Sequence, residues 1–184
     1  MRKIFSTILA IFFVAANFSI GQAAAVRLAD TNAESLLGVI NTVLSFDTIQ
    51  QKAAVVTTNL QRVDNAELAQ QGMNGLGCQY GVKNSSTPKG EILFVTDSQG
   101  YVVAMKITNY GNDDTTAMGL VMAATFFSLG MNENEMDQIL NNFKEEGALG
   151  SSSAWCSAKN RNIVMITNGG ANAQAVLVAS DQRG

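Results

Sequence analysis

The chain has 184 residues, 12 basic and 15 acidic side chains, a formal net charge of −3 and no histidine. Without histidine it cannot form a Ser-His-Asp or Cys-His catalytic arrangement or a histidine-based zinc centre, and it has no histidine general base. The acidic balance repels phosphate backbones and anionic membranes, so nucleic-acid binding is disfavoured and a cationic partner is favoured.

The N-terminus has the pattern of a secretory signal peptide. Two basic residues precede an uncharged apolar run from Ile4 to Ala16, and three alanines ending at Ala25 offer a signal peptidase site. The run is shorter than the ~20 residues of a membrane-spanning helix, which disfavours a retained anchor. We therefore predict a signal peptide at 1–25 and one exported globular domain at 26–184, in the periplasm or outside the cell. Cleavage would remove two basic residues and change the formal charge from −3 to −5.

Both cysteines, Cys78 and Cys156, lie in the predicted exported domain. Because exported thiols meet oxidising surroundings, their even number predicts a disulfide, with two buried thiols as the alternative. Two cysteines without histidine cannot complete a zinc site. Gly169-Gly170 lies between two predicted strands, which is not the setting of a phosphate-binding loop. We expect no metal and no cofactor.

In the first half of the predicted exported domain, the sequence pattern indicates two helices and two strands. Asp30-Thr31-Asn32 supplies N-cap oxygens, and apolar residues between Leu36 and Leu44 recur at helical spacing. Three glycines between positions 72 and 77 are expected to break the chain, and the polar stretch 84–90 to form a surface loop. The expected elements are a helix at 33–45, a strand at 53–58, a helix at 66–71 and a strand at 78–82.

A β-hairpin over 91–110 is the most strongly patterned segment. A strand at Ile92–Val95 is followed by a turn at Asp97–Gly100 and by a return strand of alternating residues. Tyr101, Val103, Met105 and Ile107 are expected to face the helices, and Val102, Ala104, Lys106 and Thr108 to face away from them. The alternation predicts a second sheet face that is half polar and open.

Two helices are predicted after the hairpin. The segment from Thr115 to Leu129 has no charged residue, which predicts a helix buried on most sides, with Asp113 and Asp114 at its start. It is too short to span a bilayer, so membrane insertion is disfavoured. Asn132 and Glu135 predict a capping box for the second helix, which is amphipathic.

Strands at 154–157, 162–167 and 174–179 complete the expected elements. We predict an α+β fold, with an antiparallel sheet of about five or six strands and helices packed on one face. Each half of the exported domain runs from helix-rich to strand-rich, and each strand-rich block has a cysteine near its start. An internal duplication would explain this order, although residue identity between the halves is poor.

The predicted function follows from the missing catalytic groups, the acidic charge and the open sheet face. We predict a secreted or periplasmic, non-catalytic binding module that recognises a protein or another envelope macromolecule, for example as the inhibitor of a cationic enzyme. The side chains expected at its interaction surface are Trp155, Tyr101, Tyr110, Val102, Lys106 and Thr108.

Two other functions are compatible with the sequence. A small-molecule carrier would have an apolar pocket between the helices and the sheet. A carboxylate-dependent hydrolase would need two carboxyls paired in a cleft, and Glu91, Asp97, Asp113 and Asp114 lie near strand ends where such a pair can form. Turn and capping roles explain the three aspartates without catalysis.

Overall fold

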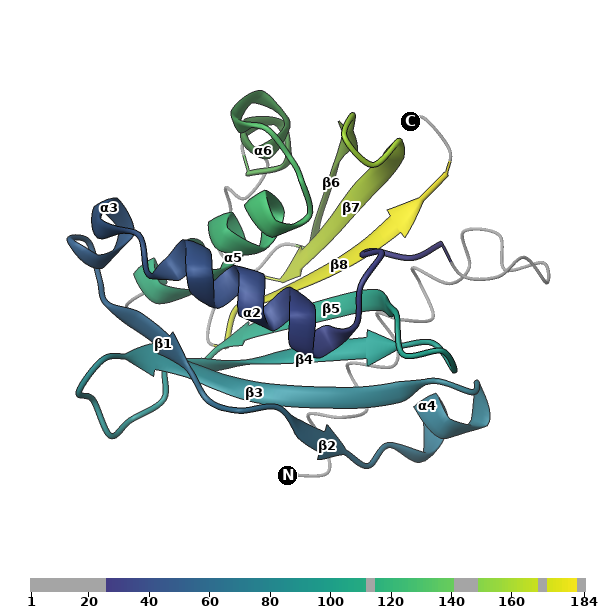
Figure 1. Cartoon of the computed structure of the whole chain (residues 1–184), viewed down its shortest axis with the longest axis horizontal. Helices are drawn as coiled ribbons and strands as arrows, with labels where there is room; N and C mark the ends of the chain where they lie inside the picture. Colours follow the sequence, from purple (N-terminus) through teal and green to yellow (C-terminus); the bar gives the residue numbers. More distant parts are fainter. Residues whose placement is uncertain (1–25, 112–114, 141–148, 169–171, 182–184) are drawn as a thin grey trace.

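The structure is a computed structural model that describes residues 26–111, 115–140, 149–168 and 172–181. It consists of one sheet with helices packed against it (Figure 1). The helices are α2 (Ala33–Leu44), α3 (Asp47–Gln50), α4 (Ala66–Gln70), α5 (Thr116–Ser128) and α6 (Glu133–Leu140). The strands are β1 (Val55–Thr57), β2 (Gln61–Val63), β3 (Asn74–Val82), β4 (Gly90–Thr96), β5 (Val102–Asn109), β6 (Leu149–Cys156), β7 (Arg161–Asn168) and β8 (Gln174–Ser180).

All the strands pair antiparallel in the order β1-β3-β4-β5-β8-β7-β6, and β2 also pairs with β3. The predicted α+β class and antiparallel sheet are confirmed, but the sheet has eight strands rather than five or six. One strand absent from the prediction is β2, which has only three residues. So short a segment has no alternation that a sequence pattern could reveal. The predicted signal peptide lies outside the described residues, and none of the described helices has the length and apolar character needed to cross a membrane.

Strand β3 is longer than predicted because it runs through two of the glycines that were expected to end it. A Cβ added at Gly75 would lie 3.3 Å from Val63 Cβ, and one added at Gly77 would lie 3.0 Å from Val63 Cγ2. Val63 of β2 therefore occupies the space that larger side chains would need. The glycines permit close packing rather than break the chain.

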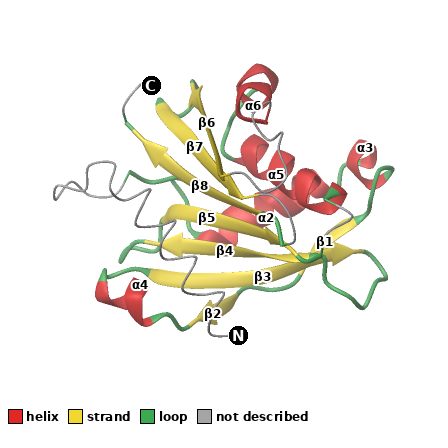
Figure 2. Ribbon diagram, turned by 180° about the vertical axis from the view of Figure 1, so that it is seen from behind, coloured by secondary structure: helices red, strands yellow, loops and turns green. Residues whose placement is uncertain are grey.

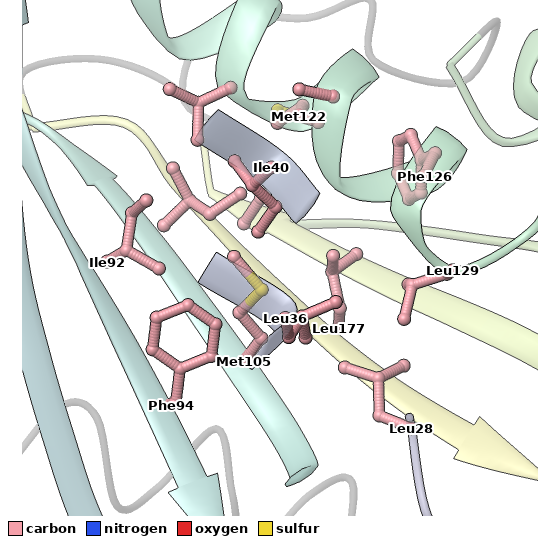
Figure 3. Close-up of a cluster of buried hydrophobic side chains, with 14 of the residues drawn as sticks. Leu28, Leu36, Ile40, Ile92, Phe94, Met105, Met122, Phe126, Leu129 and Leu177 are labelled. Atoms are coloured by element: carbon pink, nitrogen blue, oxygen red, sulfur yellow. The ribbon is translucent and has the colours of Figure 1, made fainter. Parts of the chain in front are cut away.

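The main hydrophobic core lies between the sheet and the pair of helices α2 and α5 (Figure 1). Leu36 and Ile40 of α2, Met122 and Phe126 of α5, and Phe94 of β4 all contribute to it, and each is at most 3% exposed (Figure 3). The Asn32 Oδ1 accepts a hydrogen bond of 2.8 Å from the Ser35 backbone N–H, which caps α2 as predicted. Both helices form where the sequence predicted them.

Helix α4 packs on the opposite face of the sheet, which corrects the prediction that the helices cover one face only. Its Leu68 forms a second, smaller cluster with Val95, Val103 and Ala104. Val95 directly follows Phe94, so its side chain points away from the main core. The sequence correctly indicated a helix here. It could not indicate the covered face, because a single buried leucine defines no stripe.

A β-bulge between β4 and β5 reverses the expected facing of two residues. Val95 pairs with Ala104 but Thr96 pairs with Val102, so Val103 has no partner across this ladder. Val102 therefore packs into the main core and is 0% exposed, whereas Val103 joins the cluster on the opposite face. The rest of β5 alternates as predicted.

The predicted disulfide is wrong: Cys78 and Cys156 are both free and buried. Cys78 lies on β3 and Cys156 on β6, with four strands between them in the sheet. Five strand spacings of ~4.8 Å far exceed the ~7 Å between Cα atoms that a disulfide tolerates. Burial raises the pKa of both thiols, for Cys78 to about 12. Both cysteines are therefore buried free thiols, which was the alternative to a disulfide.

Helix α6 begins with the predicted capping box. The Asn132 backbone N–H donates to Glu135 Oε2 at 3.0 Å, and the Glu135 N–H donates to Asn132 Oδ1 at 3.1 Å. Glu135 Oε1 also accepts from the Ser157 backbone N–H at 3.0 Å, which joins α6 to the turn after β6. Asp113 and Asp114, expected at the start of α5, lie outside the described residues.

Each half of the described chain ends in three consecutive strands that follow helices. In the first half α2 and α3 come before β3, β4 and β5, and in the second α5 and α6 come before β6, β7 and β8. The halves meet where β5 pairs with β8. Moving away from this junction, the sheet runs β5-β4-β3 on one side and β8-β7-β6 on the other. In both blocks, the strand that comes last in the chain therefore lies nearest to the junction.

Candidate functional site

The face of the sheet opposite α2 and α5, called here the back face, is turned toward the viewer in Figure 2. Among the described helices, only α4 packs on it, at one end. The prediction that this face is open is wrong along β5, because every residue of that strand is buried. Lys106 and Thr108 of β5 face this side because Met105 and Ile107 alternate with them into the main core. Glu91 of β4 lies directly opposite Thr108 in the ladder.

These side chains form a polar group near the end of the hairpin, defined here as the Lys106 cluster: Gln79, Glu91, Lys106, Thr108 and Tyr110. Gln79 of β3 pairs with Glu91 across the ladder. Tyr110 follows β5 directly, and its hydroxyl donates a hydrogen bond of 2.7 Å to Glu91 Oε2. Burial raises the pKa of Tyr110, and the hydrogen bond to the Glu91 carboxylate raises it further. The phenol therefore stays protonated and acts as a donor.

Two members of the cluster have polar atoms without a hydrogen-bond partner. Lys106 is 2% exposed and Thr108 is 4% exposed. Neither Lys106 Nζ nor Thr108 Oγ1 has a hydrogen-bond partner among the described residues. Burial lowers the pKa of Lys106, while the charge of Glu91 acts to raise it. Because buried polar atoms in folded proteins are nearly always paired, these two atoms are exceptions within the described fold.

A rigid layer lies beneath the cluster. Tyr80 of β3 is 1% exposed, and its hydroxyl donates to the Thr108 carbonyl oxygen at 3.1 Å. A Cβ added at Gly90 would lie 2.5 Å from Tyr80 Cζ and closer still to the Thr108 carbonyl oxygen. Only glycine fits at this position of β4. The tyrosine and the glycine together hold β3, β4 and β5 in fixed register under the cluster.

The Lys106 cluster combines an ammonium, a carboxylate, a phenol, a hydroxyl and an amide, all of them hydrogen-bonding groups. It contains one carboxylate, and among the described residues no three His, Cys, Asp or Glu side chains lie close enough to hold a metal ion. Glu91 and Asp97 lie at opposite ends of β4. Asp97 is occupied by the turn, since its Oδ1 accepts from the Gln99 and Tyr101 backbone N–H groups, each at 2.9 Å.

Three of the six predicted interaction residues come together here, and three do not. Lys106, Thr108 and Tyr110 are in the cluster, while Val102 is buried in the main core. Tyr101 lies at the other end of β5, where the Arg27 guanidinium stacks 3.7 Å from the centroid of its ring. The ladder partners Glu91 and Gln79 were not predicted as part of the surface, because they belong to other strands.

Tyr101 belongs to a region that was not predicted, formed by residues 26–32, called here the strap. Arg27 pairs with Asp97 at 3.0 Å, and Asp30 pairs with Arg161 at 2.7 Å. The side-chain hydrogen bond from Arg161 is the main cause that holds the pKa of Asp30 below its usual value. The strap thereby connects the β4–β5 turn of the first half to the start of β7 in the second.

Trp155 lies on β6 at the far edge of the sheet and is partly exposed. It lines an open pocket of about 660 Å³ between α6, β6, β7 and the turn that joins the two strands. Amide and hydroxyl side chains make up most of the lining. The pocket is therefore polar, unlike the apolar pocket expected of a small-molecule carrier.

Comparison of the chain with known proteins adds nothing to this description, because no family model, no curated protein and no solved structure matches it significantly.

Proposed function

We propose that the exported domain is a non-catalytic binding module that recognises a basic protein through the back face of its sheet, centred on the Lys106 cluster. The observation that carries the proposal is the pair of buried polar atoms, Lys106 Nζ and Thr108 Oγ1, that have no hydrogen-bond partner among the described residues. Leaving such groups unpaired costs ~1–3 kcal/mol each, a cost that a bound partner would remove.

A polypeptide supplies the groups that the cluster lacks. Both atoms are covered in the free protein, so the Lys106 side chain would turn outward on binding, and the partner's backbone carbonyl oxygens would then accept hydrogen bonds from its ammonium and from the Thr108 hydroxyl. The partner's lysine or arginine side chains would pair with the Glu91 carboxylate, which Tyr110 already orients through a hydrogen bond of 2.7 Å. A rigid sheet is suited to this role, since little ordering is needed on binding.

The overall charge favours a basic partner. The whole chain has 15 acidic and 12 basic residues, and removal of the predicted signal peptide would leave an excess of five negative charges. Such a field speeds association with a cationic protein and slows association with an acidic one, and the effect weakens as salt rises. Inhibition of a cationic enzyme is one form that this recognition would take.

The proposal is tested by site-specific photocrosslinking of the protein in its native cells. A photoreactive amino acid replaces Gln174, which is partly exposed and lies opposite Thr108 in the β5–β8 ladder, or Phe46, which is 48% exposed beside α2 and serves as the matched control. We expect one basic protein to be crosslinked from position 174 and not from position 46. Glu91→Gln in the protein with the probe at position 174 should weaken the crosslink. Equal crosslinking from both positions, or none from position 174, would overturn the proposal.

We also infer that the two halves derive from duplication of one unit. The matching order of helices and strands supports this, as does the placement of Cys78 and Cys156 on the first strand of each three-stranded block. Superposition of β3-β4-β5 on β6-β7-β8 in an experimental structure provides the test. If the strands superpose only when their order or direction is changed, the inference fails.

A further inference from the structure

The open pocket beside Trp155 carries an inference that is independent of the Lys106 cluster, because β8 lies between the strands of the two sites. The pocket is about 660 Å³ in volume, within the ~300–1,000 Å³ typical of small-molecule sites. Trp155 contributes an indole ring. The other polar lining side chains are the amides of Gln138, Asn160 and Asn162 and the hydroxyls of Ser153 and Ser157.

The antiparallel pairing of β6 and β7 forms the walls of this pocket. Trp155 lies opposite Asn162 in that ladder, and the neighbouring Ala154 and Cys156 alternate into the core. Asn160, in the connecting turn, has a φ of 50°, a left-handed conformation that asparagine tolerates better than most residues. The turn therefore brings its amide next to the strand residues.

Helix α6 is fastened to the same strands, which keeps Gln138 at the pocket. The Ser152 hydroxyl donates to the Ile139 carbonyl oxygen at 2.8 Å inside the protein. Glu135 accepts from the Ser157 backbone N–H at 3.0 Å. Burial acts to raise the pKa of Glu135, but the backbone hydrogen bonds from Ser157 and Asn132 lower it overall. The carboxylate stays ionised and holds the turn in place.

The lining is neutral throughout: among the described residues, no charged side chain lines the pocket. A charged ligand would lose hydration there without gaining a counter-charge, so a neutral one is favoured. Each carboxamide offers donors and an acceptor together, which matches neighbouring hydroxyl groups that also donate and accept. The indole offers a flat apolar surface with a polar N–H at its edge.

These features fit a sugar ring, which has one apolar C–H face and a rim of hydroxyl groups. We propose that the Trp155 pocket binds a neutral saccharide. The sugar stacks its C–H face on the indole, and its hydroxyls exchange hydrogen bonds with Asn160, Asn162 and Gln138. Because the pocket is open rather than enclosed, it takes a unit of a longer glycan as readily as a free oligosaccharide.

Trp155 is the single tryptophan of the chain, so its fluorescence reports on this pocket alone. The protein beginning at Val26 is titrated to about 10 mM with maltotriose, cellotriose and the N-acetylglucosamine trimer, and is applied to an array of neutral and anionic glycans. We expect a saturable change in emission with at least one neutral glycan, and no binding of the anionic ones.

Variants test whether the glycan binds in the Trp155 pocket. Trp155→Ala and Asn162→Ala should each weaken glycan binding about tenfold or more by calorimetry, whereas Trp155→Phe should retain part of it. Ser151→Ala changes an exposed residue of the same strand outside the pocket and should leave affinity unchanged. Circular dichroism confirms that each variant is folded. No response to any neutral glycan, preference for anionic glycans, or full affinity in folded Trp155→Ala would overturn the proposal.

Discussion

Replacement of Lys106 by methionine tests whether its buried ammonium is unpaired in the free protein. Lys106 is 2% exposed, and its Nζ has no hydrogen-bond partner among the described residues. Methionine keeps most of the chain length and removes the charge. Apolar replacement of buried ionic groups is commonly neutral or stabilising by ~1–4 kcal/mol. We expect Lys106→Met to raise the free energy of unfolding by about 2 kcal/mol, which raises Tm by ~4–8 °C.

The pH dependence of stability gives a second readout of the same group. The pKa of Lys106 is lowered in the folded protein from its usual 10.5, chiefly by burial and against the charge of Glu91. Between the folded and unfolded pKa values the unfolded chain binds more protons, so stability rises with pH in that window. The advantage of Lys106→Met should therefore be full below the lowered pKa and shrink as pH rises toward 10.5.

Urea unfolding of the protein beginning at Val26, followed by circular dichroism, measures both effects. Lys52→Met is the matched control, because Lys52 is exposed, and its stability should change by less than ~0.5 kcal/mol. A loss of more than ~1 kcal/mol in Lys106→Met would show that the ammonium has a stabilising partner in the free protein. That result would refute both the reasoning and the main support for the proposed binding surface.

Two further predictions test the packing. Gly90→Ala should destabilise the protein by about 3 kcal/mol or more or prevent folding, because the added Cβ would meet Tyr80 and the β5 backbone. Gly119→Ala on helix α5 is the control, because a Cβ added there has nothing within 4 Å. It should raise stability by ~0.5–1 kcal/mol in thermal melts. The unreduced, denatured protein should take up two thiol labels, at Cys78 and Cys156. The native protein should take up almost none, since both thiols are buried. A denatured protein without reactive thiols would contradict the free cysteines.

The elements that were predicted correctly are those with a signal contained in a few neighbouring residues. The apolar stripe from Leu36 to Leu44 and the Asn32 cap lie within one helix, and both are present in α2. The capping box of Asn132 and Glu135 spans a single turn and forms as expected. Helical spacing and capping act over three or four residues, so the amino-acid order alone reveals them.

The side of the sheet that Lys106 and Thr108 face could be predicted for the same reason. Lys106 and Thr108 alternate with core residues along one strand, and alternation can be read from the sequence. Their ladder partner Glu91 was not recognised, because its position depends on the register between β4 and β5. Val102 was misplaced because a bulge shifts that register, and a shift of one residue turns a side chain to the other face.

The amino-acid order thus determined four of the five described helices, the hairpin and the absence of histidine chemistry, whereas the four-residue α3 was not predicted. Contacts between distant segments determined the rest: Val63 fills the space above the β3 glycines, and four intervening strands keep Cys78 and Cys156 apart. The same contacts place Trp155 beside Asn162 and the α6 amide. Local patterns constrain a residue and its near neighbours, whereas strand order and register depend on which distant surfaces pack together. Both binding sites proposed for this protein are built from such surfaces.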